Sequence, residues 1–214
     1  GADGPIIQAA CASVIEKGIR VRDCLSFISQ VHSLFPHIII YLMSYASVVY
    51  SYGIEKFVID AKEAGVQGFI VPDLPFDNDE GLISFAEKKE LLYIPVITPN
   101  MSDERLQRIE ACTFSTYYCV IRKGITGSKT EIDESALKFL EGLKLKGKYL
   151  YAGFGIVEKS QAEMLAPFVE GIVAGSVFVE IIQKGLEKNE SIELIAEKLR
   201  VKSFELSGMK NNLF

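Results

Sequence analysis

The sequence predicts an α/β fold in which parallel strands alternate with helices to form a (β/α)8 TIM barrel. Six short apolar segments occur in the chain, and each is followed by a segment with helical periodicity. The apolar segments are hydrophobic continuously, as in parallel strands that are covered on both faces. Glycine-containing loops follow the last two strands, whereas a doubly wound open sheet would carry such a loop after its first strand. The position of these loops therefore favours the barrel.

Two helices are expected before the first strand. Pro5 suits the first turn of a helix, and Gly18 is placed to end that helix in the left-handed conformation. A second helix is expected over residues 21–34, and Pro36 prevents its continuation. The first strand, residues 38–43, leads into residues 44–47 at its C-terminal end, where barrel enzymes place their chemistry.

The central part of the chain repeats the strand-and-helix unit three times. The expected strands are residues 68–71, 92–98 and 116–121, and the expected helices are residues 54–64, 79–89 and 102–112. Gly65 is placed to end the first of these helices, and Ser102 is a good N-cap for the third. The segment 122–130 that follows is polar, contains two glycines and is long for a strand–helix connection. We therefore expect it to be a mobile lid.

The last two expected strands, residues 148–152 and 170–174, run into loops that contain Gly153 and Gly155, and Gly175 with Ser176. Glycine has no Cβ, so the N–H groups of such loops can approach a ligand closely, and the helix that follows adds unpaired donors. Together the two loops predict a phosphate site. The alternative is that each glycine only ends its strand tightly. The remaining helices are expected over residues 134–143, 158–165 and from 176 onward, and an amphipathic tail over 190–206.

Composition excludes several classes of function. The chain has 214 residues and a net charge of −5, with no cluster of Lys or Arg, which argues against a nucleic-acid surface. No apolar run reaches the length of a membrane span, and no signal peptide is recognisable. Cys11, Cys24, Cys112 and Cys119 lack the spacing of metal ligands, so we expect buried, reduced thiols in a cytoplasmic protein. We expect a single domain over residues 1–214.

Six motifs, spread along the chain, carry a family resemblance. They are ADGPIIQ at residues 2–8, YGIEKF at 52–57, GFIVPDLP at 68–75, GITG at 124–127, GFGI at 153–156 and GS at 175–176. In this order and at these spacings, they make the chain resemble the tryptophan synthase alpha chain family over essentially its whole length. The resemblance implies a TIM barrel of the ribulose-phosphate-binding type, in agreement with the fold expected above.

The resemblance also implies a reaction and a partner. The family cleaves indole-3-glycerol phosphate to indole and glyceraldehyde 3-phosphate, a retro-aldol reaction in tryptophan biosynthesis that needs neither a metal nor an organic cofactor. A tryptophan synthase beta chain is the expected partner, in a heterotetramer of two alpha and two beta chains.

Roles for particular residues follow from the same resemblance. Asp3 corresponds to the aspartate that accepts the indole N–H as positive charge develops on the ring, and Tyr118 to a tyrosine at the substrate site. The implied lid residues are Thr126 and Gly127; the phosphate-binding residues are Gly127, Gly155, Gly175 and Ser176; and the indole pocket comprises Met43, Tyr45, Ile70, Phe154 and Val173. An aspartate beside a helix start is also a common cap. Core packing is an equally good interpretation of Met43 and Ile70.

The chain departs from the family pattern in two respects. Ser47 stands where the family commonly has an asparagine that helps contact the partner. A barrel needs eight strands and six are expected here, so we expect two strands to precede Gly1. The family's second catalytic group, a glutamate on the second strand, would lie in that missing part. Proton transfer by such a group contributes about 10²–10⁴-fold. Residues 1–214 alone are therefore expected to be nearly inactive, and poorly soluble because the first and last strands have open edges.

Two other functions fit parts of the pattern. Another phosphate-binding barrel, an isomerase or synthase of the same pathway, would place a lysine or a second acid at a strand end. A non-catalytic barrel that binds and regulates a beta chain would have no need of Asp3, Thr126 and the phosphate-binding glycines.

Overall fold

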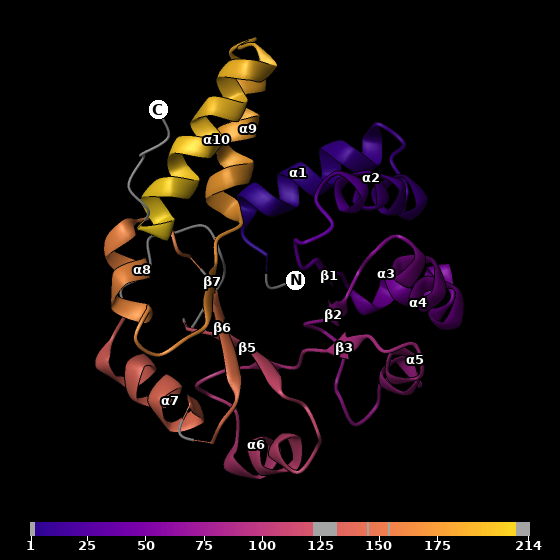
Figure 1. The fold of residues 1–214 in the computed structure, drawn as a ribbon, viewed down its shortest axis with the longest axis vertical. Helices are drawn as coiled ribbons and strands as arrows, with labels where there is room; N and C mark the ends of the chain where they lie inside the picture. The colour runs from indigo at the N-terminus through magenta and orange to yellow at the C-terminus, as the bar shows by residue number, and fades with distance from the viewer. Residues whose placement is uncertain (1–2, 122–131, 145, 154, 209–214) are drawn as a thin grey trace. The chain divides into compact units, whose positions relative to one another are not determined.

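The computed structural model describes residues 3–121, 132–144, 146–153 and 155–208 (Figure 1). The chain divides into two compact units. Unit 1 comprises Gly1–Val14, Thr98–Asn100 and Cys119–Phe214, and unit 2 comprises Ile15–Ile97 and Met101–Tyr118. Helix α1, Pro5–Glu16, and strand β5, Thr116–Val120, each contribute residues to both units.

Unit 2 contains a parallel sheet with the strand order β1-β2-β3. The register places Tyr41 opposite Gly68 and Gly68 opposite Leu92. The elements of this unit are α2 (Val21–Leu34), β1 (Tyr41–Met43), α3 (Ala46–Tyr52), α4 (Ile54–Glu63), β2 (Gly68–Ile70), α5 (Leu82–Lys88), β3 (Leu92–Tyr93), β4 (Val96–Ile97) and α6 (Asp103–Glu110). Its core includes Phe57 of α4 and Phe69 of β2, whose ring centroids are 5.3 Å apart.

Unit 1 contains the parallel pair β6 and β7, in which Gly153 lies opposite Val173. The second sheet of the chain has the strand order β4-β5-β6-β7. The elements of this unit are α7 (Glu134–Lys144), β6 (Tyr149–Gly153), α8 (Lys159–Leu165), β7 (Gly171–Val173), α9 (Ser176–Glu187) and α10 (Ile192–Ser207). Leu140, Leu150 and Leu165 are completely buried and bring α7, β6 and α8 into one core. The parallel pairs and the alternation of strands with helices confirm the expected α/β class.

The expected strand over residues 92–98 is two strands, which belong to different sheets. Ile94 donates a backbone hydrogen bond to Phe69 of β2 (2.9 Å), whereas the oxygen of Pro95 accepts one from Tyr118 of β5 (3.0 Å). Pro95 has no N–H and cannot donate to either neighbour. The chain therefore changes partners at the proline, and the expectation of one continuous strand was wrong.

The first strand is also shorter than expected, because its neighbour β2 is short. β1 begins at Tyr41, opposite the first residue of β2, and on its N-terminal side Ile40 extends the pairing by accepting a hydrogen bond from Gln67 (2.8 Å). Ile38 and Ile39 precede the paired region and are exposed. An apolar run alone therefore overestimated the strand by three residues.

Two helices of unit 2 differ from the expectation. The short helix α3 was not predicted, and it is separated from α4 by Gly53. Helix α5 begins at Leu82 instead of residue 79, because Glu80 and Gly81 have positive φ angles of 52° and 89°. Gly81 is the N-cap of this helix, and the carboxylate of Asp79, two residues earlier, accepts hydrogen bonds from the N–H groups of Gly81 and Ile83. An acidic residue that was assigned to the helix thus lies before it.

The expected helix ends at Gly18 and Gly65 are confirmed, since both residues have left-handed φ angles, of 80° and 94°. Their surroundings differ. A Cβ at Gly65 would overlap the imidazole of His32 on α2, whereas a Cβ at Gly18 would meet no described atom within 4 Å.

We expect Gly65→Ala to lower the free energy of unfolding by more than Gly18→Ala does. In both variants the left-handed backbone conformation costs an alanine about 1–2 kcal/mol. Only in Gly65→Ala does the new methyl group also overpack the structure, which costs about 1–3 kcal/mol. Urea denaturation of the two variants measures the difference. Equal loss of stability would show that the His32 ring moves aside without cost.

Candidate active site

Asp3 lies two residues before helix α1, and the contacts there settle which residue caps the helix. The oxygen of Gly4 accepts the hydrogen bond of Gln8 N at 3.0 Å, so Gly4 is the N-cap and Pro5 is the first helical residue. The side-chain amide of Gln8 donates to the backbone oxygen of Asp3 at 2.6 Å. Asp3 itself is half-buried. Asp3 therefore directly precedes the N-cap residue of α1.

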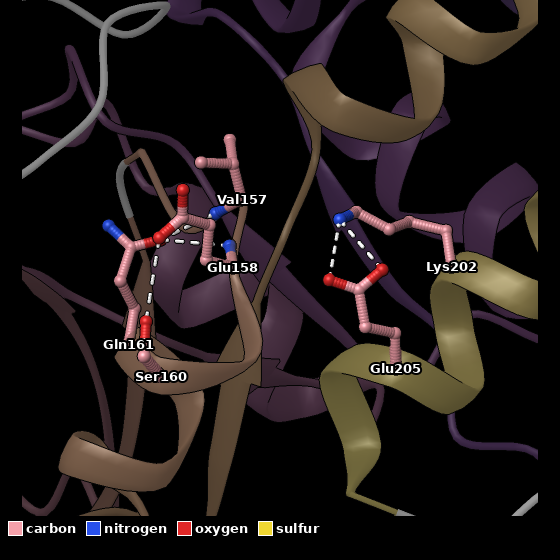
Figure 2. Close-up of polar contacts among 6 residues, drawn as sticks. All are labelled: Val157, Glu158, Ser160, Gln161, Lys202 and Glu205. Atoms are coloured by element: carbon pink, nitrogen blue, oxygen red, sulfur yellow. Dashed lines mark hydrogen bonds and ion pairs between the residues drawn. The ribbon is translucent and has the colours of Figure 1, made fainter.

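The loop after β6 is held by a side chain of the next helix. Gly155 has a φ of 80°, which favours glycine. The amide oxygen of Gln161, in the first turn of α8, accepts hydrogen bonds from Val157 N (2.8 Å) and Glu158 N (3.0 Å), as Figure 2 shows. Phe154, an expected pocket residue, lies outside the described residues.

The loop after β7 begins beside the loop after β6. Gly153 and Val173 are paired residues at the C-terminal ends of two parallel neighbours, so both loops leave the same edge of the sheet. Gly175 is the exposed N-cap of α9, and Ser176 is the first residue of this twelve-residue helix. A Cβ at Gly175 would meet no described atom within 4 Å. The structure thus brings Gly155, Gly175 and Ser176 to one edge of unit 1.

Three expected pocket residues lie at the ends of β1 and β2 in unit 2. Met43 and Ile70 are paired across these strands, and Ser44 N donates to the oxygen of Ile70 at 3.1 Å. Ile70 is buried, which agrees with core packing, whereas Met43 is 46% exposed. Tyr45 is half-buried and is the N-cap of α3.

Asp73, in the loop after β2, has a role that the sequence analysis missed. Its carboxylate accepts a hydrogen bond from Ala46 N, the first residue of α3, at 2.9 Å. The bond ties the loop after β2 to the loop after β1, next to Tyr45. In the same loop, the oxygen of Leu74 accepts a hydrogen bond from the buried hydroxyl of Tyr93 at 3.3 Å. Burial, followed by the charges of Asp79 and Asp73, raises the pKa of Tyr93 above its usual range.

The expected site residues divide between the two units. Tyr118 lies in β5, is buried, and belongs to unit 2 with Met43, Tyr45 and Ile70. Asp3, Gly155, Val173, Gly175 and Ser176 belong to unit 1. Thr126 and Gly127, with the rest of the expected lid at 122–130, lie outside the described residues.

The described ranges of the chain contain neither a metal-binding cluster nor a membrane-spanning helix. These residues contain no group of three or more His, Cys, Asp or Glu side chains that could hold a metal ion. Nor does any described helix combine the length and the apolar character needed to cross a membrane.

The four cysteines are free thiols, but the expectation that all are buried was wrong. Cys11 on α1 and Cys24 on α2 are exposed, whereas Cys119 in β5 is completely buried. Burial, and then the negative charge of Glu170, raises the pKa of the Cys119 thiol to about 12.

We expect Cys119 to resist Ellman's reagent at pH 8 while Cys11 and Cys24 react quickly, because the thiolate is the reactive form. Unfolding in guanidinium should make Cys119 react as well. The Cys119→Ser variant should lack this additional thiol, and its Cys11 and Cys24 should react at the unchanged rate. The raised folded-state pKa also means that the stability contributed by the neutral thiol is lost as the pH rises from about 8.5 towards 12. Labelling of Cys119 as fast as Cys11 would contradict its burial.

Comparison with known proteins gives a consistent result. The sequence model of the tryptophan synthase alpha chain family matches residues 1–209. The tryptophan synthase alpha chain of Caldanaerobacter subterraneus subsp. tengcongensis is 37% identical over 199 residues, which cover 92% of this chain and 74% of that protein. The alpha chain of a Thermoanaerobacter species is 32% identical over 213 residues, covering 99% and 78% respectively.

Solved structures show the same likeness. A Mycobacterium tuberculosis tryptophan synthase structure has a TM-score of 0.83 and 26% identity, covering 98% of this chain and 76% of that chain. The tryptophan synthase complex of Pyrococcus furiosus has a TM-score of 0.81 and 28% identity, covering 97% and 81%. This likeness confirms the expected (β/α)8 barrel class. Because the family model matches residues 1–209 of the 214 in this chain, the chain belongs to the tryptophan synthase alpha chain family.

Proposed function

We propose that the chain acts in tryptophan biosynthesis as an alpha subunit that cleaves indole-3-glycerol phosphate to indole and glyceraldehyde 3-phosphate. One observation carries the proposal beyond family membership. Gly153 and Val173 are paired at the ends of the neighbouring strands β6 and β7, so the two glycine-containing loops begin side by side, as a shared phosphate site requires.

The phosphate ester is the part of the substrate that these loops would hold. Gly175 is exposed and has no Cβ, so its backbone is open to a ligand. Helix α9 begins at Ser176, which adds N–H donors, a hydroxyl group and the positive end of the helix dipole. Gly155 supplies the second loop. On the family resemblance, Gly127 completes the set.

Asp3 would act at the other end of the substrate. Protonation of indole C3 places positive charge on the ring nitrogen, and a carboxylate that accepts its N–H stabilises this charge. The glyceryl hydroxyl then loses its proton and becomes the aldehyde. The electron pair of the broken C–C bond returns to the ring, and indole leaves. The two proton transfers need a second acid–base group, which the resemblance assigns to a glutamate and which none of the proposed site residues supplies.

The remaining assignments follow the resemblance residue by residue. Tyr118 would contact the reacting part of the substrate, and Thr126 would meet Asp3 from the lid. The proposed walls of the indole pocket are Met43, Tyr45, Ile70, Phe154 and Val173. Each is proposed for contact with the flat apolar ring, for which aromatic and aliphatic side chains are suited.

A tryptophan synthase beta chain is the proposed partner, in a heterotetramer of two alpha and two beta chains. The similar Pyrococcus furiosus structure is described as a tryptophan synthase complex. The free thiols of all four cysteines are compatible with the reducing cytoplasm.

The test is a cleavage assay on the protein at the length that its gene encodes, alone and with a beta chain. Indole-3-glycerol phosphate should yield indole and glyceraldehyde 3-phosphate in equal amounts. Binding of indolepropanol phosphate, an unreactive analogue, should be detectable by calorimetry. Neither binding nor cleavage in the presence of the beta chain would contradict the proposal.

A further inference from the structure

Gln161 is a buried polar residue whose position is unusual. Only 6% of its surface is exposed, and among the described residues Thr116 is the other buried polar side chain. A buried amide is stable only when its donors and acceptors are satisfied. Its amide oxygen accepts hydrogen bonds from Val157 N and Glu158 N in the loop after β6 (Figure 2), and its amide nitrogen donates to the backbone oxygen of Gly155 in the same loop.

A capping role explains part of this arrangement. Glu158 is the N-cap of α8, and Gln161 is the third residue of the helix. The side chain of Glu158 accepts from the backbone of Gln161, and that of Gln161 accepts from Glu158 N. This reciprocal pair is a capping box. It requires neither the bond from Val157 N nor the third bond, from Gln161 Nε2 to the oxygen of Gly155 at 3.2 Å.

The third bond sets the direction of a peptide group. In a trans peptide the C=O and the N–H point to opposite sides, and the described residues contain no cis peptide. The oxygen of Gly155 faces Gln161, so the N–H of Ile156 faces the other way. No described residue accepts a hydrogen bond from this N–H. The N–H groups of Val157 and Glu158, in contrast, are already used by Gln161.

We propose that Gln161 is a positioning residue for the phosphate ester: by holding the Gly155 carbonyl oxygen towards its own side chain, it turns that oxygen away from the ligand and turns the N–H of Ile156 towards it. This inference rests on the proposed function, because the phosphate is that of indole-3-glycerol phosphate. Its physical basis is that an anion is attracted by N–H groups and repelled by a carbonyl oxygen in the same place.

Two substitutions separate positioning from capping. Gln161→Glu keeps an acceptor for Val157 and Glu158 and suits a capping box, but it lacks the donor to Gly155. Gln161→Met keeps the approximate length and adds no charge, but it makes none of the three bonds. Gln183→Glu and Gln183→Met are the matched controls, since Gln183 is exposed on α9 and bonds only within its helix, to Glu187.

The measurement is calorimetry with indolepropanol phosphate and with indolepropanol, which lacks the phosphate. We expect both Gln161 variants to bind the phosphate ligand about 10–100-fold more weakly, and the Gln183 variants to bind as the wild type does. Binding of indolepropanol should change little in any variant. In the cleavage assay, KM should rise more than kcat falls, because phosphate binding is present in both ground and transition states.

The binding measurements distinguish a failure of the proposed function from a failure of the role inferred for Gln161. A wild-type protein that does not bind indolepropanol phosphate overturns the proposed function and this inference with it. A wild type that binds, together with Gln161 variants of unchanged affinity, overturns this inference alone. An equal loss of affinity for both ligands also overturns it, because the effect would not concern the phosphate. If Gln161→Met does not fold, Gln161→Glu decides by the same criteria.

Discussion

Asp3→Asn should lower the turnover of indole-3-glycerol phosphate by about 10²–10⁴-fold and leave the melting temperature nearly unchanged. The amide keeps the shape of the carboxylate but removes the negative charge that stabilises the ring nitrogen. Stability should persist because asparagine and aspartate are about equally favourable at the start of a helix. Turnover and thermal unfolding are measured on the same preparation of the protein at the length that its gene encodes.

Gln8→Met is a suitable control for this substitution. The Gln8 side-chain amide donates to the backbone oxygen of Asp3, so the variant tests the local backbone without changing the charge. A modest effect on turnover is expected. If Asp3→Asn instead retained turnover, the catalytic role of Asp3 would be contradicted.

Gly175→Val should abolish most of the affinity for indolepropanol phosphate while the chain still folds. The backbone of Gly175 has a φ of −116°, and a Cβ there meets no described atom, so the protein itself tolerates the side chain. The valine would instead occupy the space beside the N–H groups at the start of α9. Loss of one charge-assisted hydrogen bond, worth about 1.5–3 kcal/mol, weakens binding by about tenfold or more.

Gly171→Val, in strand β7 just before this loop, provides the opposite case. A Cβ at Gly171 would lie 2.8 Å from the ring of Tyr151 on β6, so this variant should unfold at a lower temperature. Calorimetry and thermal unfolding on both variants separate a glycine needed by a ligand from one needed by the fold. Unchanged affinity in Gly175→Val would remove the loop after β7 from the phosphate site.

Features that depend on one residue and its immediate neighbours could be predicted from the sequence. Gly18 and Gly65 end helices because left-handed backbone favours glycine. Ser102 caps α6 by accepting from Arg105 N at 3.3 Å, as its position before an acidic turn indicated. The glycines after β6 and β7 were likewise recognisable, because their positions follow from strand ends. Pro95 could also have indicated the division into β3 and β4, since a central strand excludes proline.

Other features depend on contacts between distant residues. The bond from Ala46 to Asp73 joins residues 27 apart, and no local pattern indicates it. Residues 158 and 161 have the spacing of a capping box, but the sequence does not show that Gln161 is buried or that it reaches Gly155. The exposure of Cys11 and Cys24 was missed for the same reason, because a helix face is buried only where another element covers it.

The distribution of thiols gives the chain a pair of natural spectroscopic reporters. Cys11 belongs to unit 1 and Cys24 to unit 2, and both are exposed on helices, whereas Cys119 is shielded. Only the half-buried Cys112 needs to be replaced before a nitroxide is attached at the other two positions. Pulsed electron resonance would then follow the separation of the two units directly, with and without indolepropanol phosphate, in a protein whose proposed site residues are unaltered.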